Sequence, residues 1–153
     1  MGANRKGLLV VVIAATSLLL MLQLGSGIWL FIHKLTFEPS RIAAAYLGDP
    51  EEFIAGKTVL GVLQTAVPHI LGMGTVALIA AHLLPYCGIG EKTLRALSAA
   101  LYLAAFGEIA APLLILSVSP HFAWLKLVSF VVFEGGIAIA LLAVMTGSLR
   151  RHG

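Results

Sequence analysis

Two glutamates inside long apolar runs are the residues of this chain whose type and position most directly suggest chemistry. Glu108 and Glu134 each lie near the middle of such a run, and an ionisable group at membrane depth is costly unless something satisfies it. Gly107 lies beside the first and Gly135 and Gly136 beside the second, so the two segments could approach closely. The pair could relay protons or contact a quinone. Alternatively, both acids are protonated and only hydrogen-bond each other or the backbone.

A histidine in another apolar run is the second candidate. His69 follows Pro68 directly, and Gly72 and Gly74 come on the next turn. Proline removes a backbone hydrogen bond, and small residues leave room for a neighbouring helix or a flat cofactor. His69 is therefore a candidate cofactor ligand or proton acceptor, and with Glu108 and Glu134 it could instead bind a metal ion. The alternative is a neutral imidazole that hydrogen-bonds a neighbouring helix.

Three further histidines could join His69 in binding haem b. His33 and His121 lie at the ends of apolar runs, at a depth similar to that of His69, and a haem b site needs two histidines on different helices. His82 lies further along the same run as His69, roughly 20 Å away along a helix axis, with its ring pointing roughly 140° away. Two haems in one core would therefore need a helix kink or another partner for His82. Each of these three could also be an ordinary interfacial residue.

The remaining polar and sulfur-containing residues have simpler interpretations. Lys126 is expected to extend toward the membrane surface. Met73 and Met145 are expected to pack, and Cys87 to be a free thiol. His152 is expected to be solvated. No metalloprotease, c-type haem or nucleotide-binding motif is present, and no catalytic residue is predicted.

The composition defines the elements that must position these residues. Apolar residues make up 59% of the chain and charged residues 11%, whereas a soluble domain has roughly a quarter charged residues. A span needs about 20 apolar residues, and four stretches qualify: 8–32, 58–84, 94–118 and 122–145. The sequence therefore predicts an all-α integral membrane four-helix bundle, with residues 1–153 as a single domain. Any catalytic head domain would have to come from a partner subunit.

The distribution of charge predicts the topology. Lysines and arginines dominate both termini and the loop between the second and third spans, whereas the loop of residues 33–57 mixes both signs. Cytoplasmic loops are enriched in basic residues, so both termini should be cytoplasmic and the long loop periplasmic, in a bacterial inner membrane. Trp29, Trp124 and Tyr86 would lie at the membrane interfaces. The net charge of +3 reflects this asymmetry and does not indicate binding of nucleic acid.

The long loop has local structure of its own. Residues 39–47 read as a short helix, because a proline stands at its start and Gly48 follows its end. Asp49 then reads as an N-cap and Pro50 as the first helical residue. On this interpretation the second spanning helix begins near residue 50.

The placement of the histidines resembles that of small membrane b-type cytochromes. One histidine falls in the first span, two in the second and one in the fourth, namely His33, His69, His82 and His121. The quinone-reactive cytochrome b subunits of bacterial hydrogenases and formate dehydrogenases are similar in this outline. The resemblance covers helix number and histidine placement rather than a specific motif, and the spacing of His69 and His82 departs from it. It implies haem b and electron transfer between a partner protein and membrane quinone.

Three functions are compatible with these residues. The first is an electron-transfer subunit that binds haem b and passes electrons to or from quinone. The second is a cofactor-free accessory subunit of a larger membrane complex. The third is an intramembrane metal or proton site at His69, Glu108 and Glu134, in a transporter or an assembly factor. These functions can be distinguished by which side chains lie close together in the fold. Haem needs two histidines that face each other, whereas a metal needs His69 together with the carboxylates of Glu108 and Glu134. Whether the protein is itself an enzyme is left open.

Overall fold

The protein is an all-α membrane protein, as the sequence predicts. The computed structural model describes residues 2–150, and the side-chain surroundings at residues 2–6, 9, 10, 86, 87 and 145–150 lie outside that description. The helices are α1 (Gly2–Lys34), α2 (Pro39–Leu47), α3 (Val59–Leu83), α4 (Glu91–Ser117) and α5 (Ala123–Arg150), with short 3-10 turns at Leu84–Cys87 and Pro120–Phe122. Within the described residues, four helices are long and apolar enough to cross a membrane, over Val11–Lys34, Val59–Leu83, Glu91–Ser117 and Pro120–Val144. The interpretations given above for Tyr86, Cys87, Met145 and His152 fall outside the described side chains.

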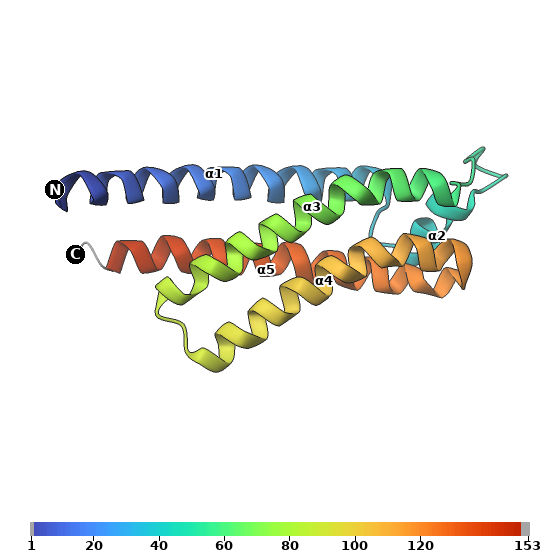
Figure 1. The fold of residues 1–153 in the computed structure, drawn as a ribbon. Helices are drawn as coiled ribbons and strands as arrows, with labels where there is room; N and C mark the ends of the chain where they lie inside the picture. The colour runs from blue at the N-terminus through green and yellow to red at the C-terminus, as the bar shows by residue number, and fades with distance from the viewer. Residues whose placement is uncertain (1, 151–153) are drawn as a thin grey trace.

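The helices pack unevenly around one another. The contact between α4 and α5 is the most extensive, α3 packs on α4, and α1 packs on α5. By contrast, α1 and α3 make little contact with each other. Figure 1 shows the start of α1 and the end of α5 at one end of the bundle and α2 at the other. The helices therefore pack closely where α4 meets α5 and only loosely where α1 lies near α3.

Two apolar clusters form the core. One contains Leu20, Met73, Leu101, Phe133 and Ile137, and the other lies at the α2 end and contains Phe31, Ile42, Tyr46, Ile115 and Phe130. The rings of Phe31 and Phe130 stack with their centroids 3.7 Å apart, which joins the end of α1 to α5.

The start of α3 differs from the prediction. Asp49 does cap a turn, since its Oδ1 accepts hydrogen bonds from the backbone N–H groups of Glu51 and Glu52. That turn stops at Phe53, whose φ is +55°, and Asp49 and Ile54 pair as an isolated bridge. The helix begins instead at Val59, where the Thr58 hydroxyl accepts from the Gly61 N–H at 3.1 Å. The prediction that the second spanning helix begins near residue 50 was wrong, because Asp49 caps this local turn and not the helix.

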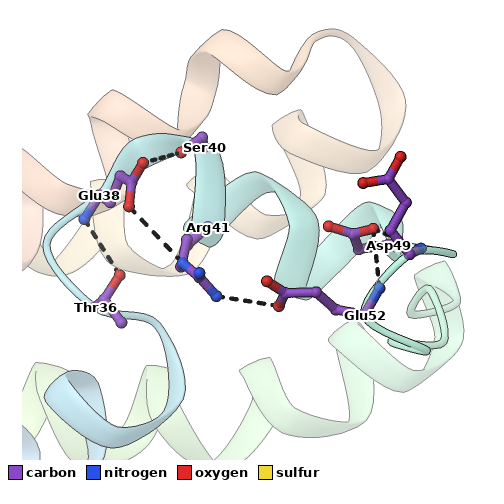
Figure 2. A network of polar contacts seen from close by, with 7 residues as sticks. Thr36, Glu38, Ser40, Arg41, Asp49 and Glu52 are labelled. Carbon is purple, nitrogen blue, oxygen red and sulfur yellow. Dashed lines mark hydrogen bonds and ion pairs between the residues drawn. The ribbon is translucent and has the colours of Figure 1, made fainter.

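The short helix predicted for residues 39–47 is confirmed as α2. Arg41 connects it to the following turn: its guanidinium donates to Glu52 at 3.1 Å and lies 3.8 Å from Glu38 (Figure 2). The Ser40 hydroxyl donates to Glu38 at 2.9 Å. All these groups are exposed, so each pair adds little stability on its own. The buried face of α2, formed by Ile42 and Tyr46, attaches it to the bundle.

Candidate functional site

A cavity of about 570 Å³ lies between α1 and α3. Gln23, Ser26 and Lys34 line it from α1, and Thr65 and His69 line it from α3. All five are exposed at the surface, so the cavity is open where α1 and α3 fail to pack. Its inner wall is built from α4 and α5 and contains Glu108, Ile109, Pro112, Lys126, Phe130, Phe133 and Glu134.

Glu108 and Lys126 form a buried ion pair across the α4–α5 contact. The Lys126 ammonium lies 2.6 Å from Glu108 Oε2, and the two side chains are 11% and 10% exposed. The expectation that Lys126 extends to the membrane surface was wrong. A charge buried at this depth is tolerated when an opposite charge and further hydrogen bonds satisfy it, and the α4–α5 contact supplies both.

Lys126 has a second hydrogen-bond acceptor, a backbone carbonyl that is available because of a proline in α4. Lys126 also donates to the backbone carbonyl of Glu108 at 3.1 Å. In a helix that carbonyl would accept the N–H of residue 112, but residue 112 is proline, which has no N–H to give. Pro112 therefore frees a carbonyl inside α4, and the ammonium of Lys126 takes the vacant place. The spacing of Glu108 and Pro112 is visible in the sequence and could have indicated this arrangement.

Glu134 is the second buried acid on the cavity wall. It is 8% exposed, and its carboxylate fits against Gly27 of α1, where a Cβ atom would collide with Oε1. Among the described residues, Glu134 Oε2 and Glu108 Oε1 are buried side-chain oxygens that have no hydrogen-bond partner. An unpaired buried polar atom costs about 1–3 kcal/mol, so the hydrogen-bonding capacity of both carboxyl groups is incompletely satisfied within the described residues.

His69 faces the same cavity from α3. Its Nδ1 lies 2.9 Å from the carbonyl oxygen of Thr65, and because a carbonyl can only accept, Nδ1 carries the hydrogen. In the neutral tautomer with this hydrogen, Nε2 is a hydrogen-bond acceptor. The structure thus brings the predicted candidates His69, Glu108 and Glu134 to one cavity.

The other candidate histidines lie elsewhere. His33 is exposed on α1 with its ring 4.4 Å from that of Trp29, and the His121 Nδ1 is 3.0 Å from the Ser119 hydroxyl. His82 is exposed near the opposite end of α3. Of the described histidines, His69 alone lines the cavity. A haem b with two histidine ligands therefore does not fit this cavity, and haem stays a prediction.

The metal alternative has no support from the geometry. Over the part of the chain that the structure describes, no three His, Cys, Asp or Glu side chains gather closely enough to hold a metal ion. His69, Glu108 and Glu134 share the cavity without converging on one point. The Glu108 carboxylate is already paired with Lys126, which satisfies the charge that a metal would otherwise neutralise.

Three residues at the α2 end of the cavity were not predicted as part of a site. They are Lys34, Tyr46 and Lys57. Burial, with the Lys34 and Lys126 charges, lowers the pKa of Lys57. Burial and then the charge of Glu108 raise the pKa of Tyr46 to about 12, so the phenol keeps its proton. These residues come from three separate segments, and no local pattern in the sequence would have grouped them.

The fold and the cavity define a multi-pass membrane protein with ionisable groups inside its helical bundle. A family model described as a transmembrane helical domain (Aq_1264_TM) matches residues 36–153, and the chain belongs to this family. No curated protein matches the chain, and no solved structure matches it. The family description agrees with the membrane location and names no cofactor or partner.

Proposed function

We propose that this domain is a membrane-embedded subunit that binds a quinone or quinol between α1 and α3 and exchanges protons with it. The observation that supports this most directly is the pair of unpartnered buried oxygens, Glu108 Oε1 and Glu134 Oε2. A quinol has two hydroxyl donors, and a hydroxyl could reach one of these oxygens only if the carboxyl group turned the oxygen toward the cavity. The oxidation of quinol releases two electrons and two protons. In this proposal the carboxylates take up the protons, and a redox centre in a partner protein takes up the electrons.

The walls of the cavity suit a ligand of this class. Aliphatic and aromatic side chains, among them Leu30, Met73, Phe130 and Phe133, line it beside the polar groups. Ligand sites in proteins are commonly apolar pockets with a few placed polar groups. Because α1 and α3 pack little against each other, a lipid-soluble molecule could enter sideways from the bilayer. The cofactor-free alternative gives these unpartnered oxygens no role.

The Glu134→Gln variant is expected to bind quinol about tenfold more weakly or worse, because one carboxylate oxygen becomes an amide NH2, which donates hydrogen bonds and cannot accept them. The dissociation constant is measured by isothermal titration calorimetry of the purified protein with a short-tailed quinol analogue. Glu91→Gln is the matched control, since Glu91 is exposed and pairs with Arg95 at the far end of α4. Equal affinity in wild type and Glu134→Gln, or no binding by wild type, would contradict the proposal.

The Gly27→Ala variant tests the same site by shape alone. Its new methyl group would collide with the Glu134 carboxylate, so we expect weaker quinol binding although no charge is lost. Gly25→Ala is the control, because a Cβ atom at residue 25 meets nothing within 4 Å. If Gly27→Ala and Gly25→Ala bind quinol alike, the position of the Glu134 carboxylate is irrelevant to the ligand.

A redox difference spectrum separates this function from the predicted haem-dependent one. A dithionite-reduced minus oxidised spectrum of protein expressed with ample haem would show a b-type α-band if haem is bound. A band that disappears in His69→Ala would assign His69 as a ligand and would require a second axial ligand from outside this cavity.

A further inference from the structure

A cluster of cationic side chains surrounds the α2 end of the cavity, away from Glu134. Lys34 is the last residue of α1 and Lys57 lies just before α3, and both line the cavity with Tyr46 of α2. We call these three residues the cationic mouth. The ion pairs of the described residues join other side chains, so neither Lys34 nor Lys57 has a carboxylate partner there.

The backbone positions this mouth firmly. The Lys57 N–H donates to the Tyr46 carbonyl at 2.8 Å, and the Lys57 ammonium lies 4.4 Å from the centre of the Tyr46 ring. The segment between them folds back tightly at Gly48, which has a φ of +92° and leaves no room for a Cβ beside Gly56. Lys57 is therefore held beside the Tyr46 ring at the edge of the cavity, with its side chain still exposed.

The charge in the cavity favours an anion at this point. Lys34, Lys57 and Lys126 line it together with Glu108 and Glu134; Glu108 pairs with Lys126, and none of the ion pairs among the described residues joins Glu134 to a lysine. The two remaining cations repel each other. Burial, and to a smaller extent the charges of Lys34 and Lys126, lowers the pKa of Lys57. A bound anion would offset both the burial and the repulsion.

The depth of the mouth indicates where the anion comes from. Lys34 ends one membrane span and Lys57 stands two residues before the next, which begins at Val59. These are the positions at which spans reach lipid headgroups, and basic pockets between spanning helices bind acidic headgroups. Below the mouth the cavity continues between α1 and α3 past Leu30, Val62 and Ala66, which are suited to an acyl chain.

We propose that the cationic mouth binds the phosphate of an acidic phospholipid, whose acyl chains lie in the opening between α1 and α3. The phosphate would contact the Lys34 and Lys57 ammonium groups, with the Tyr46 hydroxyl as a further donor. The headgroup would contact residues other than the unpartnered carboxylates, whereas the acyl chains would compete with a quinone for the opening between α1 and α3.

The test is native mass spectrometry of the full chain in detergent, titrated with phosphatidylglycerol or phosphatidylcholine. We expect phosphatidylglycerol to be retained in preference to phosphatidylcholine. Each of Lys34→Gln and Lys57→Gln should weaken that retention about fivefold, the effect of removing one cation near a headgroup. Lys92→Gln, at the exposed start of α4, is the control and should not change it.

Several outcomes would overturn the proposal. Equal retention of the two lipids, or wild-type retention in Lys34→Gln and Lys57→Gln, would remove the cationic mouth as a lipid site. Displacement of phosphatidylglycerol by millimolar inorganic phosphate would assign the mouth to a free anion instead. Lys57→Arg keeps the charge and should keep the lipid, which separates loss of binding from loss of fold. Glu134→Gln should leave lipid retention unchanged while it weakens quinol binding, so the two proposals can fail independently.

Discussion

Replacing Lys126 with methionine is expected to destabilise the bundle by about 3–5 kcal/mol, the cost of breaking a buried ion pair from one side. Methionine keeps the unbranched shape of the side chain but not the ammonium. Glu108 would then have neither a cation nor a donor for Oε2, and the carbonyl freed by Pro112 would also lose its partner. The measurement is the free energy of unfolding from a titration with SDS in mixed micelles, followed by far-UV circular dichroism.

The double variant Glu108→Gln and Lys126→Met shows whether the cost comes from the unpaired charge. With both charges removed, the buried glutamine is neutral, so we expect much of the lost stability to return. Lys92→Met is the control, because Lys92 is exposed and its replacement should change stability within about 0.5 kcal/mol. If Lys126→Met behaves like Lys92→Met, the pair contributes nothing to the fold.

The architecture could be predicted from the sequence because bilayer thickness constrains it. A span must be apolar over about 20 residues, and four such runs in a short chain allow little besides a four-helix bundle. The short helix α2 was also predictable, since Pro39 and Gly48 mark its ends. The start of α3 was not, because Asp49 can cap either a helix or a single turn, and the choice depends on how residues 49–57 fold back onto Tyr46.

The sequence identified three residues of the candidate site but not how they are arranged relative to their partners. Glu108, Glu134 and His69 were recognisable because ionisable groups are rare in spans. Their partners depend on rotation and depth between helices, which periodicity does not specify. The partner of Lys126 is Glu108 on the neighbouring helix α4, so the sequence around Lys126 does not reveal the ion pair. Histidine placement alone suggested haem, yet three of the four candidate histidines lie away from the cavity.

Gly107 of α4 and the adjacent pair Gly135 and Gly136 of α5 show the same limit at the level of single residues. All three were expected to permit close helix approach. The structure places Gly107 against Ser129, with a Cβ there in collision with the hydroxyl, and Gly136 against Leu101 at 2.8 Å. A Cβ at Gly135 meets nothing within 4 Å. The close approach of α4 and α5 therefore needs Gly107 and Gly136 but not Gly135, although all three look alike in sequence.

This difference predicts opposite effects of the same substitution. Gly107→Ala should destabilise the bundle by about 1–3 kcal/mol, since it overpacks the α4–α5 contact beside the Glu108–Lys126 pair. Gly135→Ala should be neutral or stabilising by up to about 1 kcal/mol, because alanine favours helix over glycine and no neighbour is displaced. Both are measured by the unfolding titration used for Lys126→Met.

A compensating variant decides whether the Gly107 effect is steric. Ser129 is buried on α5, and Ser129→Gly removes both atoms that the new methyl group would meet first, Oγ and Cβ. The double variant Gly107→Ala and Ser129→Gly moves the small residue from one helix to the other and keeps the contact volume similar. We expect it to be more stable than the sum of the two single variants by at least about 0.5 kcal/mol, the coupling typical of residues in contact. Strictly additive effects would mean that α4 and α5 do not meet at Gly107, and the depth at which Lys126 reaches Glu108 would then have to differ as well.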